Sequence, residues 1–270
     1  ETLNRIRIML RALYSSASGM QAQQMNLDVI ANNLANVNTT GFKKSKIEFQ
    51  DLLYQTDRSA GAESGAGNQV PTSLQVGHGS RAVATAKVFS AGEISSTGEK
   101  MDLAIHGNGF FKVTLPDGSN AFTRDGGFKL NSTGNIVTSD GLPVTSFAGV
   151  TISPEVTNVS ISPTGVVSVT QAGTTTTAGN LVLSRFANPA GLENIGSNLY
   201  RETPSSGTEQ TGEPGNAGMG SVQQGYLELS NVKVVEEMVN LIKAQRAYEI
   251  NSKSIQAADE MMSMSNRLRG

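Results

Sequence analysis

The feature that most constrains the fold is a long stretch of helical periodicity near the N-terminus. From about Leu13 to Phe42, apolar and small residues recur at alternating intervals of four and three. That spacing forms the a and d seam of a coiled-coil-like helix. The seam positions are Leu13, Ala17, Met20, Gln24, Leu27, Ala31 and Leu34. The pattern predicts a long N-terminal helix that needs a partner surface.

The other faces of this helix are polar but almost uncharged. Between Ser15 and Gly41 the only charged residue is Asp28, whereas a surface helix ordinarily carries Lys, Glu and Arg opposite its apolar stripe. Two interpretations stay open. The helix packs inside a large single domain, or its amide and hydroxyl groups are buried against other copies of the chain, where they avoid the desolvation cost of a charge.

A second helical stretch, from Asn231 to Leu268, carries a similar seam. Its members are Val234, Met238, Leu241, Gln245, Tyr248, Ser252, Ile255, Asp259 and Met262. Because polar residues interrupt this seam, we expect it to bind a matching surface rather than form a stable free coiled coil. Ser230 or Asn231 is predicted to cap this helix, and Gly41 to take the left-handed position at the end of the first.

Between the helices the period changes to two. From Leu74 to about Leu199, short β-branched and aromatic runs alternate with turn residues, which predicts an all-β domain of many short strands. Before it, Phe42 to Tyr54 is predicted to be an extended arm, and the Gly/Ser/Ala-rich segment Asp57 to Ser73 a flexible loop.

The predicted fold class is therefore α+β. Long N- and C-terminal helices pair as a coiled-coil-like domain, with an extended arm and an inserted all-β domain between them. The predicted boundaries are 1–41 for the N-terminal helix, 42–73 for the arm and loop, 74–222 for the all-β domain, and 223–270 for a return strand and the C-terminal helix.

Composition excludes several classes of function. The chain has 21 basic and 23 acidic residues and no basic stripe interleaved with aromatics, so no nucleic-acid partner is expected. Cysteine is absent, which excludes disulfides and thiolate metal sites. No apolar run approaches the ~20 residues that span a bilayer, so direct membrane insertion is not expected. The N-terminal segment lacks the continuous apolar region of a secretory signal.

The residues that could carry chemistry do not form a recognisable site. Gly107 to Gly109 precedes another predicted strand rather than a helix, and is predicted to be a tight turn rather than a phosphate loop. His78 and His106 are isolated in the sequence and are expected to be surface or turn residues. Three Asp-Gly pairs lack the ligand pattern of an EF-hand and are predicted hairpin turns; they begin at Asp117, Asp125 and Asp140. No catalytic, cofactor-binding or metal-binding residue is assigned, and an enzyme is not expected.

The segment from Ala31 to Lys43, ANNLANVNTTGFK, resembles the signature of the bacterial flagellar rod and hook family. The signature positions are Ala31, Asn32, Asn33, Leu34, Ala35, Asn36, Thr40, Gly41, Phe42 and Lys43. The resemblance recurs at 102–143, at 225–232 (GYLELSNV) and at 245–251 (QRAYEIN). With the segment DLLYQT at 51–56 and the chain length added, the chain most resembles the distal rod branch of this family. The pattern of that branch would begin at Met9, so it does not account for Glu1 to Ile8.

The resemblance implies a structural subunit that self-assembles into a rigid helical tube, the rod of the flagellar basal body, which transmits torque from motor to hook. The implied location is the periplasmic rod, reached without a cleaved signal peptide. The implied partners are further copies, proximal rod proteins, the hook protein, the P- and L-ring proteins and the flagellar type III export apparatus. The expected assembly seam is Leu13, Ala17, Met20, Leu27, Ile30, Leu34, Val234, Met238, Leu241, Tyr248, Ile255 and Met262.

Alternatives stay open at this point. Another flagellar rod or hook-basal protein shares the signature. In a different class, a secreted β-domain binding module would use its terminal helices to form a closed dimer or trimer. The signature asparagines either hydrogen-bond across subunits or close the end of the helix.

Overall fold

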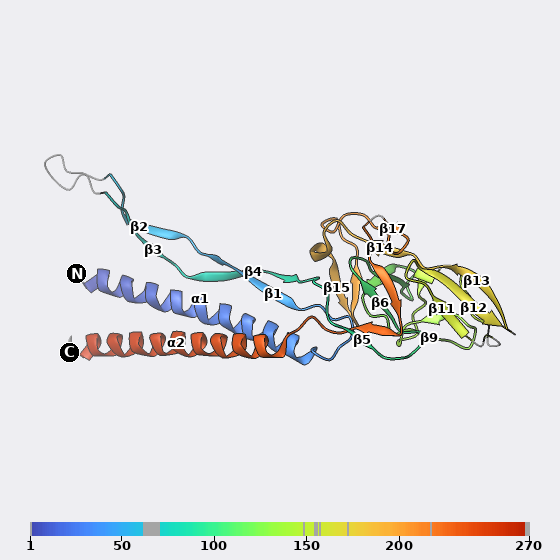
Figure 1. Cartoon of the computed structure of the whole chain (residues 1–270). Coiled ribbons are helices and arrows are strands. Elements are labelled where there is room, and N and C mark those ends of the chain that lie inside the picture. The colour runs from blue at the N-terminus through green and yellow to red at the C-terminus, as the bar shows by residue number, and fades with distance from the viewer. Residues whose placement is uncertain are drawn as a thin grey trace. The chain divides into compact units, whose positions relative to one another are not determined.

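The computed structural model describes residues 2–61, 71–147, 149–153, 156, 158–171, 173–216 and 218–267. The chain is α+β, as predicted, with one long helix at each end and a β-rich middle (Figure 1). It divides into two compact units: Glu1–Leu34 with Ser45–Ala86 and Val234–Gly270, and Ala35–Lys44 with Lys87–Lys233. Most of the loop predicted at 57–73 lies outside the described residues.

The first unit contains both long helices, α1 (Thr2–Ala35) and α2 (Val234–Arg267), which run in opposite directions (Figure 1). Buried residues of α2 recur every seven residues: Glu237, Ala244 and Ala258. Asn251 belongs to the same row, and its Nδ2 would lie only 3.0 Å from a Cβ added at Gly19 of α1. Small residues on both helices therefore permit a close approach. Among the described residues, no helix is long and apolar enough to cross a membrane.

The segment predicted as an extended arm pairs with residues 74–87, which were predicted as part of the all-β domain, to form a two-stranded ribbon in the same unit. Strand β1 (Ser45–Asp51) pairs with β4 (Ser80–Lys87), and β2 (Tyr54–Arg58) pairs antiparallel with β3 (Leu74–Gly77). The Asn33 amide accepts from the Ser45 N–H and donates to its carbonyl, both at 2.9 Å. Farther along, Arg11 Nη1 lies 3.3 Å from Asp57 Oδ2. Side chains of α1 thus hold the ribbon at two places.

The second unit contains the remaining strands in small sheets. The largest has the order β15–β16–β8–β7, a three-stranded sheet has the order β11–β12–β13, and the other pairs are β5–β19, β6–β18, β9–β10 and β14–β17. The strands are β5 (Ile94–Ser96), β6 (Leu103–His106), β7 (Phe111–Thr114), β8 (Asn120–Thr123), β9 (Lys129–Leu130), β10 (Ile136–Val137), β11 (Asn158–Ile161), β12 (Val166–Gln171), β13 (Thr174–Asn180), β14 (Leu183–Arg185), β15 (Glu193–Gly196), β16 (Leu199–Arg201), β17 (Gln210–Gly212), β18 (Ser221–Gln224) and β19 (Tyr226–Glu228). Two 3₁₀ turns lie at Thr145–Phe147 and Pro189–Gly191.

The core of the second unit follows from the period-two pattern. In β7, Phe111 and Val113 are buried while the residues between and after them are half-buried. Phe111 packs edge-to-face on Phe128, with ring centroids 4.9 Å apart, inside the main apolar cluster. A second cluster is aromatic and consists of Phe110, Phe122, Phe186, Leu192 and Tyr200, with Phe89 packed against it.

The predicted turns are confirmed at two of the three Asp-Gly pairs. Asp117 Oδ1 accepts from the Ser119 N–H at 2.8 Å in the hairpin between β7 and β8. The Gly141 N–H donates to the Thr138 carbonyl in a tight turn. The hairpin predicted at Asp125 is wrong, because the flanking strands β8 and β9 pair with other strands and not with each other.

The phenol of Tyr200 should ionise late. Tyr200 is 2% exposed, and burial raises its pKa to about 12, with nearby Arg124 acting in the opposite direction. Because the folded-state pKa lies above the unfolded value of about 10, this group stabilises the fold below pH 10 and loses that contribution as the pH rises towards 12. We expect an ultraviolet absorbance titration of the folded chain to show a phenolate component near pH 12. The Tyr200→Phe variant should lack it, and an unchanged titration curve in that variant would contradict the assignment.

Candidate functional site

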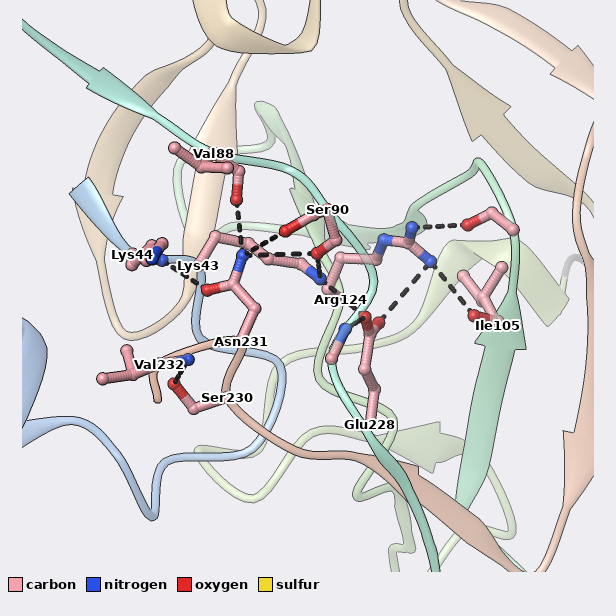
Figure 2. A network of polar contacts seen from close by, with 12 residues as sticks. Lys43, Lys44, Val88, Ser90, Ile105, Arg124, Glu228, Ser230, Asn231 and Val232 are labelled. Atoms are coloured by element: carbon pink, nitrogen blue, oxygen red, sulfur yellow. Dashed lines mark hydrogen bonds and ion pairs between the residues drawn. The ribbon is translucent and has the colours of Figure 1, made fainter. Parts of the chain in front are cut away.

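A buried polar network forms where three distant segments of the second unit meet (Figure 2). The first is Thr40–Lys43, which follows α1. The second contains Arg124, directly after β8, and the third runs from Glu228 at the end of β19 to Asn231. Lys43 and Glu228 are 185 positions apart in the chain.

The carboxylate of Glu228 is the centre of this network. Its Oε1 accepts from Lys43 Nζ at 2.6 Å and from the Gly92 N–H at 2.8 Å. Its Oε2 lies 3.6 Å from Arg124 Nη1. Glu228, Lys43 and Arg124 are respectively 2%, 0% and 4% exposed. One buried carboxylate therefore faces two buried cations.

Backbone carbonyls satisfy the two cations further. Lys43 Nζ donates to the Ser90 carbonyl at 2.8 Å, and Arg124 donates to the carbonyls of Ile105 and Gly107. Burial lowers the pKa of Lys43, and the charge of Glu228 opposes that shift. Burial likewise lowers the pKa of Arg124, again against the charge of Glu228. The contact with this carboxylate therefore offsets part of the desolvation cost of each cation.

Gly41 brings the first and third segments together. Its N–H donates to the Glu228 carbonyl at 2.8 Å. Its φ of 66° is left-handed, as predicted, but α1 already ends at Ala35, so Gly41 does not cap the helix. A Cβ at this position would lie 2.5 Å from the backbone nitrogen of Asp125. Glycine is needed here both for the φ value and for the close backbone approach.

The prediction that Asn231 caps α2 is wrong, because α2 begins at Val234. The Asn231 Oδ1 instead accepts from the Lys44 N–H at 2.8 Å, and its Nδ2 donates to the Val88 carbonyl at 2.7 Å. Ser230 Oγ accepts from the Val232 N–H at 3.3 Å, still ahead of the helix. Asn231 therefore joins the segments that leave α1 and enter α2.

The signature residues divide into two groups. Those at the end of the segment enter the network or its surroundings: the Thr40 hydroxyl donates to Asp125 Oδ1 at 2.9 Å, and Lys87 Nζ lies 4.5 Å from the centre of the Phe42 ring. Within the helical part, Asn33 is buried and Leu34 half-buried, while Ala31, Asn32 and Ala35 are exposed. Asn36 lies just after the helix, and its Oδ1 accepts from the Thr39 hydroxyl at 3.2 Å.

The predicted seam residues are covered to different degrees. Ile30 is buried; Leu13, Met20, Leu27, Leu34, Leu241, Ile255 and Met262 are half-buried; and Ala17, Val234, Met238 and Tyr248 are exposed. The most buried row of α2 is a different one, through Glu237, Ala244 and Ala258. Among the described residues, no three His, Asp or Glu side chains gather as metal ligands. His106 is exposed and His78 half-buried.

Sequence reasoning did not find Arg124 or Glu228. A signal existed for Glu228, because it is the only charged residue in the strand-like run GYLELS. An isolated charge in an apolar strand indicates a buried partner. Its identity as Lys43 could not be read from the sequence.

Each segment of the network matches a known family model. Residues 13–43 match the "Flagella basal body rod protein" model, 104–169 the "Flagellar hook protein FlgE/F/G D1 domain", and 223–268 the "Flagellar basal body rod FlgEFG protein C-terminal". Lys43, Arg124 and Glu228 thus come from three different matched regions. The chain belongs to the flagellar basal-body rod family.

The relatives place the chain within this family. The flagellar basal-body rod protein FlgG of Borreliella burgdorferi is 51% identical over 266 residues, covering 97% of this chain and 99% of the relative. FlgG of Caulobacter vibrioides is 46% identical, and the match covers 96% of this chain and 100% of the relative. FlgF of the same organism is 34% identical, and the match covers 93% of this chain and 94% of the relative. The chain therefore falls with the FlgG, distal rod, proteins, which are structural components of the flagellar basal body.

Removing the Lys43 charge should destabilise the fold strongly. In Lys43→Met the Glu228 carboxylate stays buried without its closest partner, so we expect a loss of roughly 3–5 kcal/mol in unfolding free energy. Urea denaturation of the purified chain measures it. Lys46→Met is the matched control, since Lys46 is exposed and should change stability by less than about 0.5 kcal/mol. Equal effects of the two substitutions would show that the pair is not important for stability.

Gly41→Ala should separate backbone strain from steric clash. Gly118 also has a positive φ, 81°, but an added Cβ there meets nothing within 4 Å. Gly118→Ala should therefore cost only the left-handed strain, about 1 kcal/mol. Gly41→Ala adds a backbone clash and should cost at least about 2 kcal/mol more. Thermal unfolding of both variants measures the difference, and similar losses would argue against the close approach at Asp125.

Proposed function

We propose that this chain self-assembles through its terminal helices into the rigid helical tube of the flagellar distal rod, which transmits torque from motor to hook. Its family membership supports a structural role in the rod. The observation that carries self-assembly is the amount of apolar surface that α2 leaves exposed.

Large apolar side chains stand exposed along most of α2. Val235 is 74%, Ile250 63% and Ile242 56% exposed. The full set on this helix is Val234, Val235, Met238, Val239, Ile242, Tyr248, Ile250, Met261 and Met264. Within the first turns, Val235, Val239 and Ile242 follow helical spacing and form one stripe. A stripe of this kind is removed from water when another surface covers it.

The uncharged faces of α1 support the same proposal. Asp28 is the only charge between Ser15 and Gly41, so contact with another copy would desolvate few ions there. We propose that the predicted seam residues of both helices face neighbouring copies or one another in the inner tube as a coiled-coil-like assembly domain. Residues 1–41 and 223–270 would form this inner layer, with 74–222 outside it and 42–73 between.

A tube requires a heterologous interface, in which two different patches of the chain meet. Such an interface repeats without limit unless its rotation closes a ring. The proposed partners are further copies, proximal rod proteins, the hook protein, the P- and L-ring proteins and the type III export apparatus. The proposed location is the periplasmic rod, reached without cleavage of a signal peptide.

Charges placed in the exposed stripe should stop elongation. In Val235→Lys/Ile242→Lys both positions are exposed in the chain itself, so the fold should survive, whereas a covered stripe could not accept two ammonium groups. Electron microscopy and sedimentation should show straight tubes for the unmodified chain and small species for the variant. Leu130→Lys is the control: Leu130 is 43% exposed but lies in the second unit, and tubes should persist.

The same measurement separates the alternative function. A discrete oligomer of the unmodified chain that never elongates would contradict the proposal. It would favour a closed binding module with oligomerising helices.

A further inference from the structure

The two long helices carry the exposed methionines of the chain, among those whose exposure the structure describes. Met238 is 52%, Met261 50% and Met264 55% exposed on α2, and Met25 is 41% exposed on α1. Met219, in the second unit, is only 8% exposed. Because the sequence contains no cysteine, methionine thioethers are its only sulfur atoms. A peroxide should therefore react first with sulfur on the helices.

The exposed methionines of α2 belong to the apolar surface that is proposed to meet other copies. Met238 lies three positions after Val235 and four before Ile242, so these three side chains share one face of the helix. Met261 and Met264 are three positions apart near the other end of α2 and share a face in the same way. The surface to be covered therefore contains thioethers near both ends of the helix.

A methionine suits such a surface only while its sulfur is reduced. The thioether is apolar and flexible, so it packs well on irregular apolar surfaces. Oxidation to the sulfoxide adds an oxygen that makes the side chain polar and disrupts methionine-rich interfaces. Beside Met238, the side chains of Val235 and Ile242 offer this oxygen no hydrogen-bond donor. Covering the oxidised stripe would therefore bury a polar group at a cost in free energy.

We propose that methionine oxidation on α2 controls assembly. A chain in which Met238, Met261 and Met264 are reduced elongates, and a chain that carries sulfoxides at these positions does not. This inference rests on the proposed self-assembly through the terminal helices and adds a chemical control of the same surface. Because the stripe is covered in the tube, oxidation acts on the free chain and assembled subunits are protected.

The oxidant is a hydroperoxide, and hydrogen peroxide is the simplest. The methionine sulfur attacks one peroxide oxygen, so that an S–O bond forms while the O–O bond breaks. The departing hydroxide takes the proton from the oxygen that stays on sulfur and leaves as water. The sulfur is oxidised and the peroxide is reduced. Methionine sulfoxide reductases, one for each epimer, reverse the change by using thiols to remove the oxygen as water.

The test treats the free full-length chain with dilute hydrogen peroxide and then removes the peroxide with catalase. Peptide mass spectrometry should show Met238, Met261 and Met264 oxidised at least about fivefold faster than Met219. Electron microscopy and sedimentation should show tubes for the untreated chain and small species for the oxidised chain. Treatment with both sulfoxide reductases should restore elongation. Equal tube formation by the untreated and the oxidised chain would overturn the inference.

Leucine variants assign the effect to α2. Met238→Leu/Met261→Leu/Met264→Leu conserves volume and apolarity but removes the thioethers, so it should elongate with or without peroxide treatment. Met25→Leu is the matched control, because it removes an exposed methionine of α1; this variant should stay as sensitive to peroxide as the unmodified chain. Failure of the oxidised triple variant to elongate, when its untreated form does, would refute the assignment to α2.

Preformed tubes give a second measurement that needs no variant. Peroxide should oxidise Met238 at least about tenfold more slowly in tubes than in the free chain, because the stripe is covered there. Equal rates would contradict both the covered stripe and the control proposed for it. Protection of Met238 in tubes, together with normal elongation of the oxidised chain, would contradict only the control by oxidation. An untreated chain that never elongates would contradict the proposed function and this inference with it.

Discussion

The buried carboxylate of Glu228 is the interaction on which the middle of the chain depends. It faces Lys43 and Arg124, and all three groups are almost completely withdrawn from water. A charge in such surroundings is tolerated only when its partners are in place. The segment after α1, the segment after β8 and the end of β19 are therefore required together. Because Gly41 and Asn231 bond across the same segments, the segment that follows α1 and the segment that precedes α2 are joined within one β-rich unit.

The two long helices use their surface differently from an ordinary surface helix. One row of α2 is small or buried, through Ala244 and Ala258, and Asn251 of this row lies close to Gly19 on α1. Other rows of α2 leave valine, isoleucine and methionine in water. Exposed apolar stripes are costly for a free chain and favourable in an assembly. The presence of both a buried row and exposed apolar rows on α2 fits a subunit whose helices also pack against other chains.

Arg124 connects the network with the aromatic cluster. Its Nη atoms bond to backbone carbonyls and lie near Glu228, and its guanidinium carbon lies 5.6 Å from the ring centre of Phe110, a member of that cluster. Tyr200 packs on Phe89 and Phe110 beside it. The same low-polarity surroundings therefore raise the pKa of Tyr200 and strengthen any electrostatic contact made by Arg124.

The sequence by itself determined the helices, the β-rich middle and the family. Heptad spacing and period-two alternation are local signals, because they record which face of an element is covered. The signature segment likewise identified Gly41 and Lys43 as positions of the rod and hook family signature. It did not indicate which residues they contact. Turn chemistry was sufficient at Asp117, where the hydrogen bonds span two residues.

Only the tertiary structure decided what those residues contact. Lys43 meets Glu228 across 185 positions, and Asn231 bonds to segments near 44 and 88 instead of capping the helix that follows it. No hairpin forms at Asp125, because β8 pairs with β7 and β16 while β9 pairs with β10. Local patterns report that a side chain needs a partner; they do not identify the partner, because that choice depends on which distant strands the folded chain brings together.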